Sequence, residues 1–254
     1  MVMDIAWPMA AAVVAWWLGT GVILWLDRQG PVALRAGLVV WSLLLLMALY
    51  GARISMTATS SAHAYLGFFS AIAMWGWHEL VFLSGRLTGP RRIAMSVGAT
   101  GLERFKQAFA AVLWHELALV ANAALLWLMQ AQQPNHVALC TFGLLWCLRL
   151  VAKLNLFVGV PLVGAQYLPA HLQYMASYFQ VAQVGWWYRL TLTLATAGWV
   201  ALIWQTQGAS AADFTGWVLL CTLFGLGILE MLIMVLPWPV QQLWGWMIRL
   251  PDPT

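Results

Sequence analysis

Residues 60–84 read SSAHAYLGFFSAIAMWGWHELVFLS, and the only Asp, Glu, Lys or Arg among them is Glu79. The hydrocarbon core of a bilayer is about 30 Å thick and an α-helix rises about 1.5 Å per residue, so about 20 apolar residues span it. The stretch is long enough, and it is continuous, whereas membrane β-strands alternate apolar and polar residues over about ten positions. It therefore predicts a transmembrane α-helix.

The rest of the chain has the same character. Of its 254 residues, 63% are hydrophobic and only 8% are charged, against about 25% charged in a typical soluble domain. So few charged groups cannot cover the surface of a soluble fold, which excludes that class. We attribute the formal net charge of +4 to basic loops that orient the chain in a membrane, and we expect no nucleic-acid partner.

Seven stretches of the chain are long and apolar enough to cross a membrane. They lie at about residues 5–26, 34–52, 60–84, 106–130, 137–160, 186–205 and 212–236. Gly and Pro residues separate several of them, as in Gly30-Pro31 and Gly89-Pro90, and such pairs end helices. We expect an all-α integral membrane protein, a bundle of about seven transmembrane helices that forms one polytopic domain over residues 1–254.

The basic residues predict how this bundle is oriented. With the N-terminus in the periplasm and the C-terminus in the cytoplasm, only Arg53 lies on the outer side. The cytoplasmic side then holds nine basic residues: Arg28, Arg35, Arg86, Arg91, Arg92, Arg104, Lys106, Arg189 and Arg249. An excess of Lys and Arg on the cytoplasmic side is the usual signature of orientation. The sequence thus predicts a multi-pass protein of the cell inner membrane.

Two cytoplasmic connections are long enough to have a role of their own. The one at about residues 85–106 holds five of the twelve basic residues: Arg86, Arg91, Arg92, Arg104 and Lys106. Basic residues near a membrane surface bind anionic lipid, but the same set could dock a partner protein, and the sequence leaves both interpretations open. In the other connection, residues 161–185, Pro169 predicts the start of a short helix in the membrane interface.

Seven ionisable residues fall inside the predicted helices: His78, Glu79, His115, Glu116, Arg149, Lys153 and Glu230. An unpaired charge at the bilayer centre costs at least about 2.5 kcal/mol, so such residues usually face the bundle interior and serve a function. Counting residues from the helix ends places His78, His115, Lys153 and Glu230 at a common depth, about 9–14 Å from the cytoplasmic side, and Arg149 one helical turn deeper on the same face as Lys153. The string Trp77-His78-Glu79-Leu80 is also repeated as Trp114-His115-Glu116-Leu117 in the next helix.

This cluster admits several interpretations. In the simplest, Glu79, Glu116 and Glu230 neutralise Arg149 and Lys153, the histidines and Asn155 complete the hydrogen bonds, and one acid in excess is protonated. Alternatively, one or both of His78 and His115 are axial ligands of a tetrapyrrole metal, for which His171 in the 161–185 connection is a third candidate. A metal ion held by the His and Glu residues, or a relay for protons or solutes, would use the same groups. No residue is assigned a catalytic role, because neither a nucleophile elbow nor HExxH occurs.

Several strings of this sequence, taken together and in order, resemble one family. They are Trp75-Gly76-Trp77-His78-Glu79, Thr88-Gly89-Pro90-Arg91-Arg92, His115-Glu116-Leu117-Ala118-Leu119, Lys153 to Val160, Leu168 to Leu172, Ser177-Tyr178-Phe179 and Leu229-Glu230. The family is PuhE of purple phototrophic bacteria, also called photosynthetic complex assembly protein 2. The chain departs from its pattern at Met231, where a His often follows the Glu, which argues against a metal site made of three His-Glu pairs.

The resemblance implies a function but no defined chemical activity. It implies a factor in the inner, intracytoplasmic photosynthetic membrane that helps to assemble the reaction centre and light-harvesting complexes or supplies bacteriochlorophyll to them. The expected partners are subunits of those complexes or pigment-synthesis proteins, together with membrane lipid. Two alternatives stay open: a membrane-bound enzyme that modifies a tetrapyrrole or carotenoid with the His/Glu cluster, and a structural subunit of the mature complex.

Overall fold

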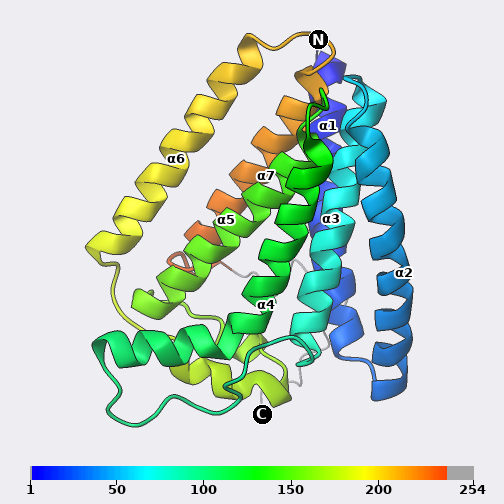
Figure 1. Cartoon of the computed structure of the whole chain (residues 1–254). Coiled ribbons are helices and arrows are strands. Elements are labelled where there is room, and N and C mark those ends of the chain that lie inside the picture. The colour runs from blue at the N-terminus through cyan, green and yellow to red at the C-terminus, as the bar shows by residue number, and fades with distance from the viewer. Residues whose placement is uncertain (1, 239–254) are drawn as a thin grey trace.

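The computed structural model of the chain describes residues 2–238, and this part is a bundle of α-helices (Figure 1). Its seven α-helices are α1 (Val2–Asp27), α2 (Pro31–Ser55), α3 (Ser61–Leu83), α4 (Gly101–Gln130), α5 (Val137–Val158), α6 (Trp186–Gln207) and α7 (Phe214–Ile233). Two short 3-10 helices, η1 (Ala165–Tyr167) and η2 (Ala170–Tyr178), lie between α5 and α6. Residues 2–238 hold no β-strand longer than one isolated bridge, between Val160 and Val181.

The prediction of an all-α membrane protein is confirmed. Six of the helices, α1 to α5 and α7, are long and apolar enough to cross a membrane. α6 occupies the remaining predicted stretch and has 22 residues, but its Trp, Thr and Gln side chains lower its hydropathy, and it does not meet the same criterion. The orientation of the bundle stays a prediction, and Arg249, which was counted for it, lies outside the described residues.

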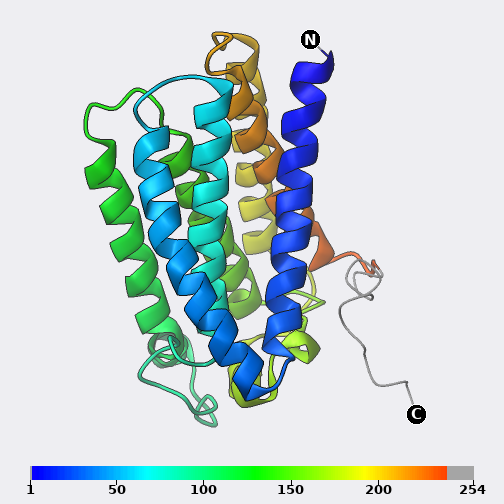
Figure 2. The same cartoon turned by 90° about the vertical axis from the view of Figure 1, so that its right-hand side faces the viewer.

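α3 is the central helix of the bundle (Figure 2). It packs against α2, α5, α1 and α7, and 50% of its most apolar stretch is buried in protein, against 11% for α2. Small residues permit this close packing, because a Cβ at Gly67 would lie 2.9 Å from the Ser55 hydroxyl of α2. A side chain on α3 therefore lies within reach of most other helices.

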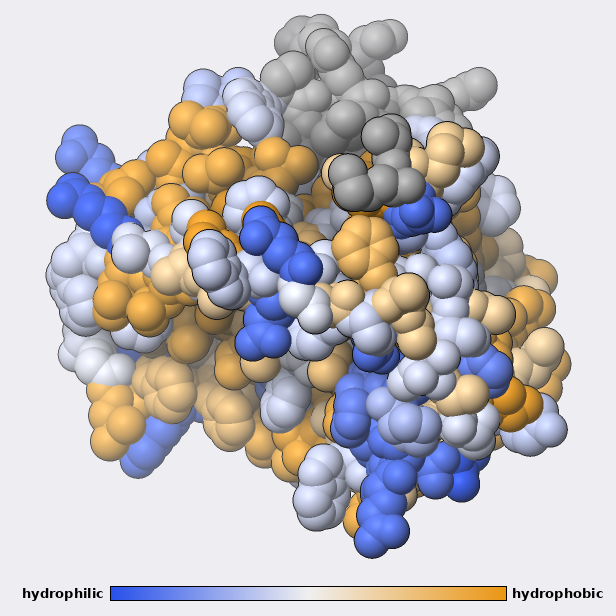
Figure 3. Space-filling view, turned by 90° about the horizontal axis from the view of Figure 1, so that it is seen from above, coloured by the Kyte–Doolittle hydropathy of each residue, from blue (hydrophilic) through white to orange (hydrophobic). Residues whose placement is uncertain are grey.

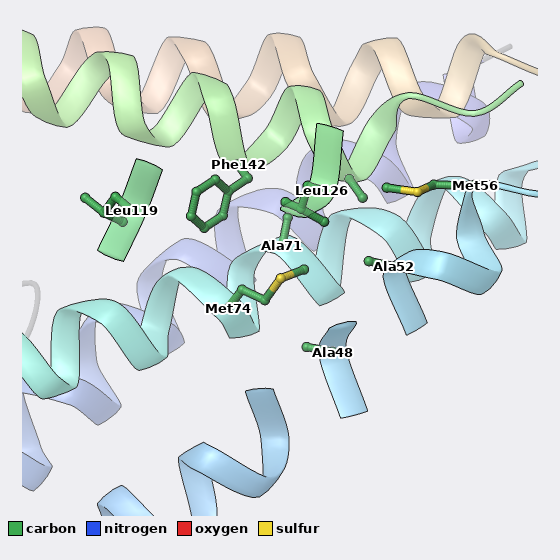
Figure 4. Close-up of a cluster of buried hydrophobic side chains, with 9 residues drawn as sticks. Ala48, Ala52, Met56, Ala71, Met74, Leu119, Leu126 and Phe142 are labelled. Atoms are coloured by element: carbon green, nitrogen blue, oxygen red, sulfur yellow. The ribbon is translucent and has the colours of Figure 1, made fainter. Parts of the chain in front are cut away.

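The main apolar core lies where α2, α3, α4 and α5 meet. Figure 4 shows its fully or nearly fully buried side chains: Ala48, Ala52, Met56, Ala71, Met74, Leu119, Leu126 and Phe142. The ring of Phe142 packs edge-on against Trp75, with 5.8 Å between the ring centroids. This core fixes the part of the bundle from which the ionisable side chains of α3, α4 and α5 project.

α4 is bent close to the second His-Glu pair. Its first turns lie across the end of the bundle, and the remainder runs along the bundle (Figure 1). Residues 88–90, which we call the inserted loop, lie in the bend: His115 N–H donates to the Thr88 carbonyl (3.0 Å) and Arg91 N–H donates to the Ala110 carbonyl (3.3 Å). Interruption of the helical hydrogen bonds is a common cause of a kink. A Cβ at Gly89 would overlap the Ala110 carbonyl oxygen, so only glycine fits there.

The two ends of the bundle differ. We call the end that carries the connections α1–α2, α3–α4 and α5–α6 the basic end, and the first turns of α4 and the helix η2 both lie across it (Figure 1). η2 begins after Pro169, where a short helix was predicted. Figure 3 looks down on the opposite end, where hydrophilic and apolar residues are interspersed and hydrophilic groups reach the edge in several places.

Candidate functional site

The first ion pair at membrane depth joins α3 to α5. Arg149 donates from Nη2 to Oε2 of Glu79 over 3.3 Å. The Glu79 side chain is 11% exposed and its other oxygen has no hydrogen-bond partner, whereas 44% of the Arg149 side chain is left uncovered by protein. The pair therefore has one end in the bundle interior and one end at its surface.

The second ion pair joins α4 to α5 and is more enclosed. Lys153 donates from Nζ to Oε1 of Glu116 over 2.5 Å, and the indole N–H of Trp146 donates to Oε2 over 3.1 Å. The side chains of Lys153 and Glu116 are 25% and 11% exposed. Because Arg149 and Lys153 are one helical turn apart, α5 alone supplies the cations for the acids of two neighbouring helices.

The third acid, Glu230, joins α7 to α1. The indole N–H of Trp16 donates to Oε1 of Glu230 over 2.7 Å. Glu230 lies within electrostatic range of Arg149 but forms no ion pair with any residue of the described chain. The polar cluster thus connects α1, α3, α4, α5 and α7, with three acids and two bases.

Within residues 2–238, Asn155 makes no hydrogen bond to these carboxylates. Its Oδ1 accepts a hydrogen bond from the Thr191 hydroxyl of α6 over 3.1 Å, and it is completely buried. Its role in the structure is to tie α5 to α6, the peripheral helix.

The two repeated histidines lie side by side in the bundle interior. His78 and His115 are 3% and 1% exposed, and their ring centroids are 6.4 Å apart. The ring of Phe82 lies 4.6 Å from that of His115, and the ring of Phe142 lies 5.9 Å from that of His78. Both ring nitrogens of His78, and Nδ1 of His115, have no hydrogen-bond partner among the residues that the structure describes. Since leaving a buried polar group unpaired costs about 1–3 kcal/mol, these nitrogens require a functional or structural explanation.

These histidines fit a tetrapyrrole in chemistry but not in space. A free imidazole nitrogen is a suitable axial ligand for a chelated metal. However, both rings are covered by protein, so a macrocycle cannot reach them in this conformation. His171 binds the backbone instead: its Nε2 lies 2.8 Å from the carbonyl oxygen of Leu83, where it caps the end of α3. No three His, Cys, Asp or Glu residues within 2–238 come together in a way that could hold a metal ion.

The connection at residues 85–106 contains both internal and exposed basic residues. Arg91 donates from Nε to the Tyr178 hydroxyl (2.9 Å), and Arg104 donates to the Phe157 carbonyl (2.6 Å) while lying over the ring of that residue. Both therefore hold the connection to η2 and to the end of α5. Arg86, Arg92 and Lys106 are exposed.

Some site residues could not be identified from the sequence. Trp16 and Trp146 donate to Glu230 and Glu116, but the chain has 18 Trp residues, and membrane proteins use most of them at the interface. Thr88 supports the backbone of His115 from 27 positions earlier in the chain. The only local signal for that contact was the Gly89-Pro90 pair.

The fold and the site define a class: a multi-pass α-helical membrane protein whose interior holds ion pairs and two unpartnered histidines. The chain belongs to the DUF3623 family, described as "Protein of unknown function", whose model matches residues 2–253. It is similar to the "Uncharacterized 30.4 kDa protein in puhA 5'region" of Rhodobacter capsulatus. The two are 38% identical over 261 residues, which cover 99% of this chain and 94% of that protein. No solved structure matches the chain.

Proposed function

We propose that this protein is an inner-membrane assembly factor for the photosynthetic reaction centre and light-harvesting complexes. The observation that carries the proposal is the polar cluster at membrane depth, in which one helix, α5, holds acids of α3 and α4 beside two unpartnered histidines. Groups of this kind are costly in a membrane and are usually retained for function.

The similarity of the chain to other proteins also supports a role in photosynthesis. The relative in Rhodobacter capsulatus is named for its position in the 5′ region of puhA. The sequence strings around His78, His115 and Glu230 resemble the PuhE family, and the two names share the puh designation. An assembly role for photosynthetic complexes accounts for both relationships.

Arg149 is the residue best placed to contact a partner within the membrane. Among residues 2–238, only one of its N–H groups has a hydrogen-bond partner, and 44% of its side chain is uncovered. A guanidinium group at membrane depth binds carboxylate or carbonyl groups strongly. A transmembrane segment with such a group would bind here, which is what a factor that holds an unassembled subunit requires.

A second candidate function rests on the histidine pair. Imidazoles with free nitrogens beside Glu116 and Lys153 are groups that transfer protons, as an enzyme that modifies a tetrapyrrole or carotenoid would need. A deletion strain of the native host separates the two functions. Loss of an assembly factor lowers the amount of assembled complexes while the extracted pigments keep their normal composition. Loss of an enzyme causes one defined pigment precursor to accumulate, and that result would refute the assembly role.

Affinity purification of the tagged protein tests the remaining alternative. Recovery in a fixed one-to-one ratio with mature reaction centres would make it a structural subunit and would contradict a transient role. Recovery far below that ratio, with unassembled subunits, is what the proposal predicts.

A further inference from the structure

A hollow lies at the basic end, between the connection that follows α3 and the first turns of α4. Its volume is about 540 Å³, and it is lined by Pro90, Arg91, Arg92, Ile93, Glu103, Lys106, Gln107 and Ala110. It adjoins the inserted loop, because Pro90 belongs to that loop and Ala110 accepts the hydrogen bond from Arg91. The hollow is separate from the polar cluster in the bundle interior.

The charge around this hollow is positive in net, although Glu103 is among its lining residues. Five cations and one carboxylate, Glu103, lie in residues 86–106. None of the five cations forms an ion pair with a carboxylate of the described chain. Arg91 and Arg104 bind neutral groups, namely hydroxyl and carbonyl oxygens, and Glu103 accepts a hydrogen bond from the amide of Gln107 (2.8 Å). The hollow therefore favours an anionic group.

The first turns of α4 are amphipathic. Leu102, Phe105 and Phe109 are 67%, 44% and 47% exposed, and their spacing places them on one side of the helix. Glu103, Lys106, Gln107 and Ala110, which line the hollow, lie on the adjacent side. Because this part of α4 lies across the end of the bundle (Figure 1), its apolar side can face acyl chains while its basic side faces the headgroups.

We infer that the hollow binds the headgroup of an anionic phospholipid. Arg92 and Lys106 contact its phosphate from the two walls of the hollow, and Phe105 and Phe109 lie along its acyl chains. Both cations are available, since Arg92 makes one hydrogen bond, to the Arg86 carbonyl (3.3 Å), and Lys106 makes none within residues 2–238. A partner protein fits the observations less well, because the charged and apolar sides match the membrane interface in which the helix lies.

Lipid-dependent stabilisation tests the inference. The full-length protein is purified in a mild neutral detergent, and its thermal unfolding is followed while phosphatidylglycerol or phosphatidylcholine is added. We expect phosphatidylglycerol to raise the unfolding midpoint more than phosphatidylcholine does. In an Arg92→Gln/Lys106→Gln variant its apparent affinity should fall about 30-fold, as expected for the loss of two basic contacts. The matched control is Arg28→Gln/Arg35→Gln, which removes the same charge from exposed residues of the basic end that do not line the hollow.

Native mass spectrometry provides a second readout that does not depend on stability. The wild-type and control proteins should retain one more phosphatidylglycerol molecule than the Arg92→Gln/Lys106→Gln variant. Equal retention by the variant would overturn the inference. An equal midpoint shift with glycerol 3-phosphate alone would also overturn it, since the ligand would then be a soluble phosphate and not a lipid.

Discussion

The two copies of the Trp-His-Glu-Leu string have the same sequence but different surroundings. In α3, Leu80 is completely buried, and within the described part of the chain Glu79 binds only Arg149, which is 44% uncovered. In α4, Leu117 is 49% exposed, and Glu116 is held by both Lys153 and Trp146. The Trp-His-Glu-Leu string therefore determines which chemical groups are present at each site. The position of the helix in the bundle determines how many contacts hold each group.

The backbone of the two copies also differs. The copy in α3 lies in an unbroken helix at the centre of the bundle, whereas the copy in α4 follows a kink and depends on the inserted loop. We expect the α4 copy to be the more rigid in its side-chain contacts and the more sensitive to distant backbone changes.

Removing the cation that pairs with Glu116 should lower the free energy of unfolding more than any other change considered below. Lys153→Met leaves an enclosed carboxylate without its cation and should destabilise the protein by about 3–5 kcal/mol. Arg149→Met should cost less, about 1–2 kcal/mol, because it also removes a cation that protein leaves 44% uncovered at membrane depth, where such a charge is itself costly. Chemical unfolding in detergent measures both. A Lys153→Met/Glu116→Gln variant should recover most of the loss, and equal costs for the two single variants would show that the copies are equivalent.

The second-largest loss of stability is expected when the contact between the inserted loop and α4 is disrupted. Gly89→Ala places a Cβ on the Ala110 carbonyl and should cost about 2–3 kcal/mol by forcing the loop out of the bend in α4. Gly143→Ala in α5 is the control, because a Cβ there meets nothing within 4 Å. If both variants unfold at the wild-type midpoint, the contact between loop and helix does not support His115.

A smaller effect on stability distinguishes Trp146 of α5, which donates to the Glu116 carboxylate of the α4 copy, from Trp77, which belongs to the α3 copy. Trp146→Phe removes a hydrogen bond to the Glu116 carboxylate and should cost about 1.5–3 kcal/mol. Trp77→Phe removes a hydrogen bond to the neutral Ser42 hydroxyl and should cost about 0.5–1.5 kcal/mol. The reverse order in thermal unfolding would contradict the view that the α4 copy is the more firmly held.

The smallest effect on stability is expected at the histidines. His78→Leu/His115→Leu replaces unpartnered buried nitrogens with apolar atoms, so the free energy of unfolding should stay within about 1 kcal/mol of wild type or rise. A loss of several kcal/mol would show that the imidazoles form hydrogen bonds that support the fold.

Much of the fold follows from the sequence because hydrophobic length alone determines a membrane span. Residues 60–84 predict α3 to within a residue at each end. The similar depth of the two His-Glu strings and Lys153, with Arg149 one helical turn from Lys153 on the same face, also indicated that these residues could meet, and Glu79, Glu116, Arg149 and Lys153 form the two ion pairs. The bend in α4, by contrast, is produced by the Thr88 carbonyl, and local hydropathy contains no information about so distant a contact. The same holds for Trp16 and Glu230, which meet only because α1 packs against α7.

In the proposed function, the polar cluster in the bundle interior serves the assembly of photosynthetic complexes. The most direct test replaces the gene in its native host with the His78→Leu/His115→Leu variant and records near-infrared absorption of the membranes at matched levels of the protein. His136→Leu, an exposed residue at the opposite end of the bundle, is the control. We expect the double variant to contain fewer assembled complexes while its extracted pigments are normal. We expect the His136→Leu variant to contain assembled complexes at the wild-type level. Assembled complexes at the wild-type level in the double variant would contradict it.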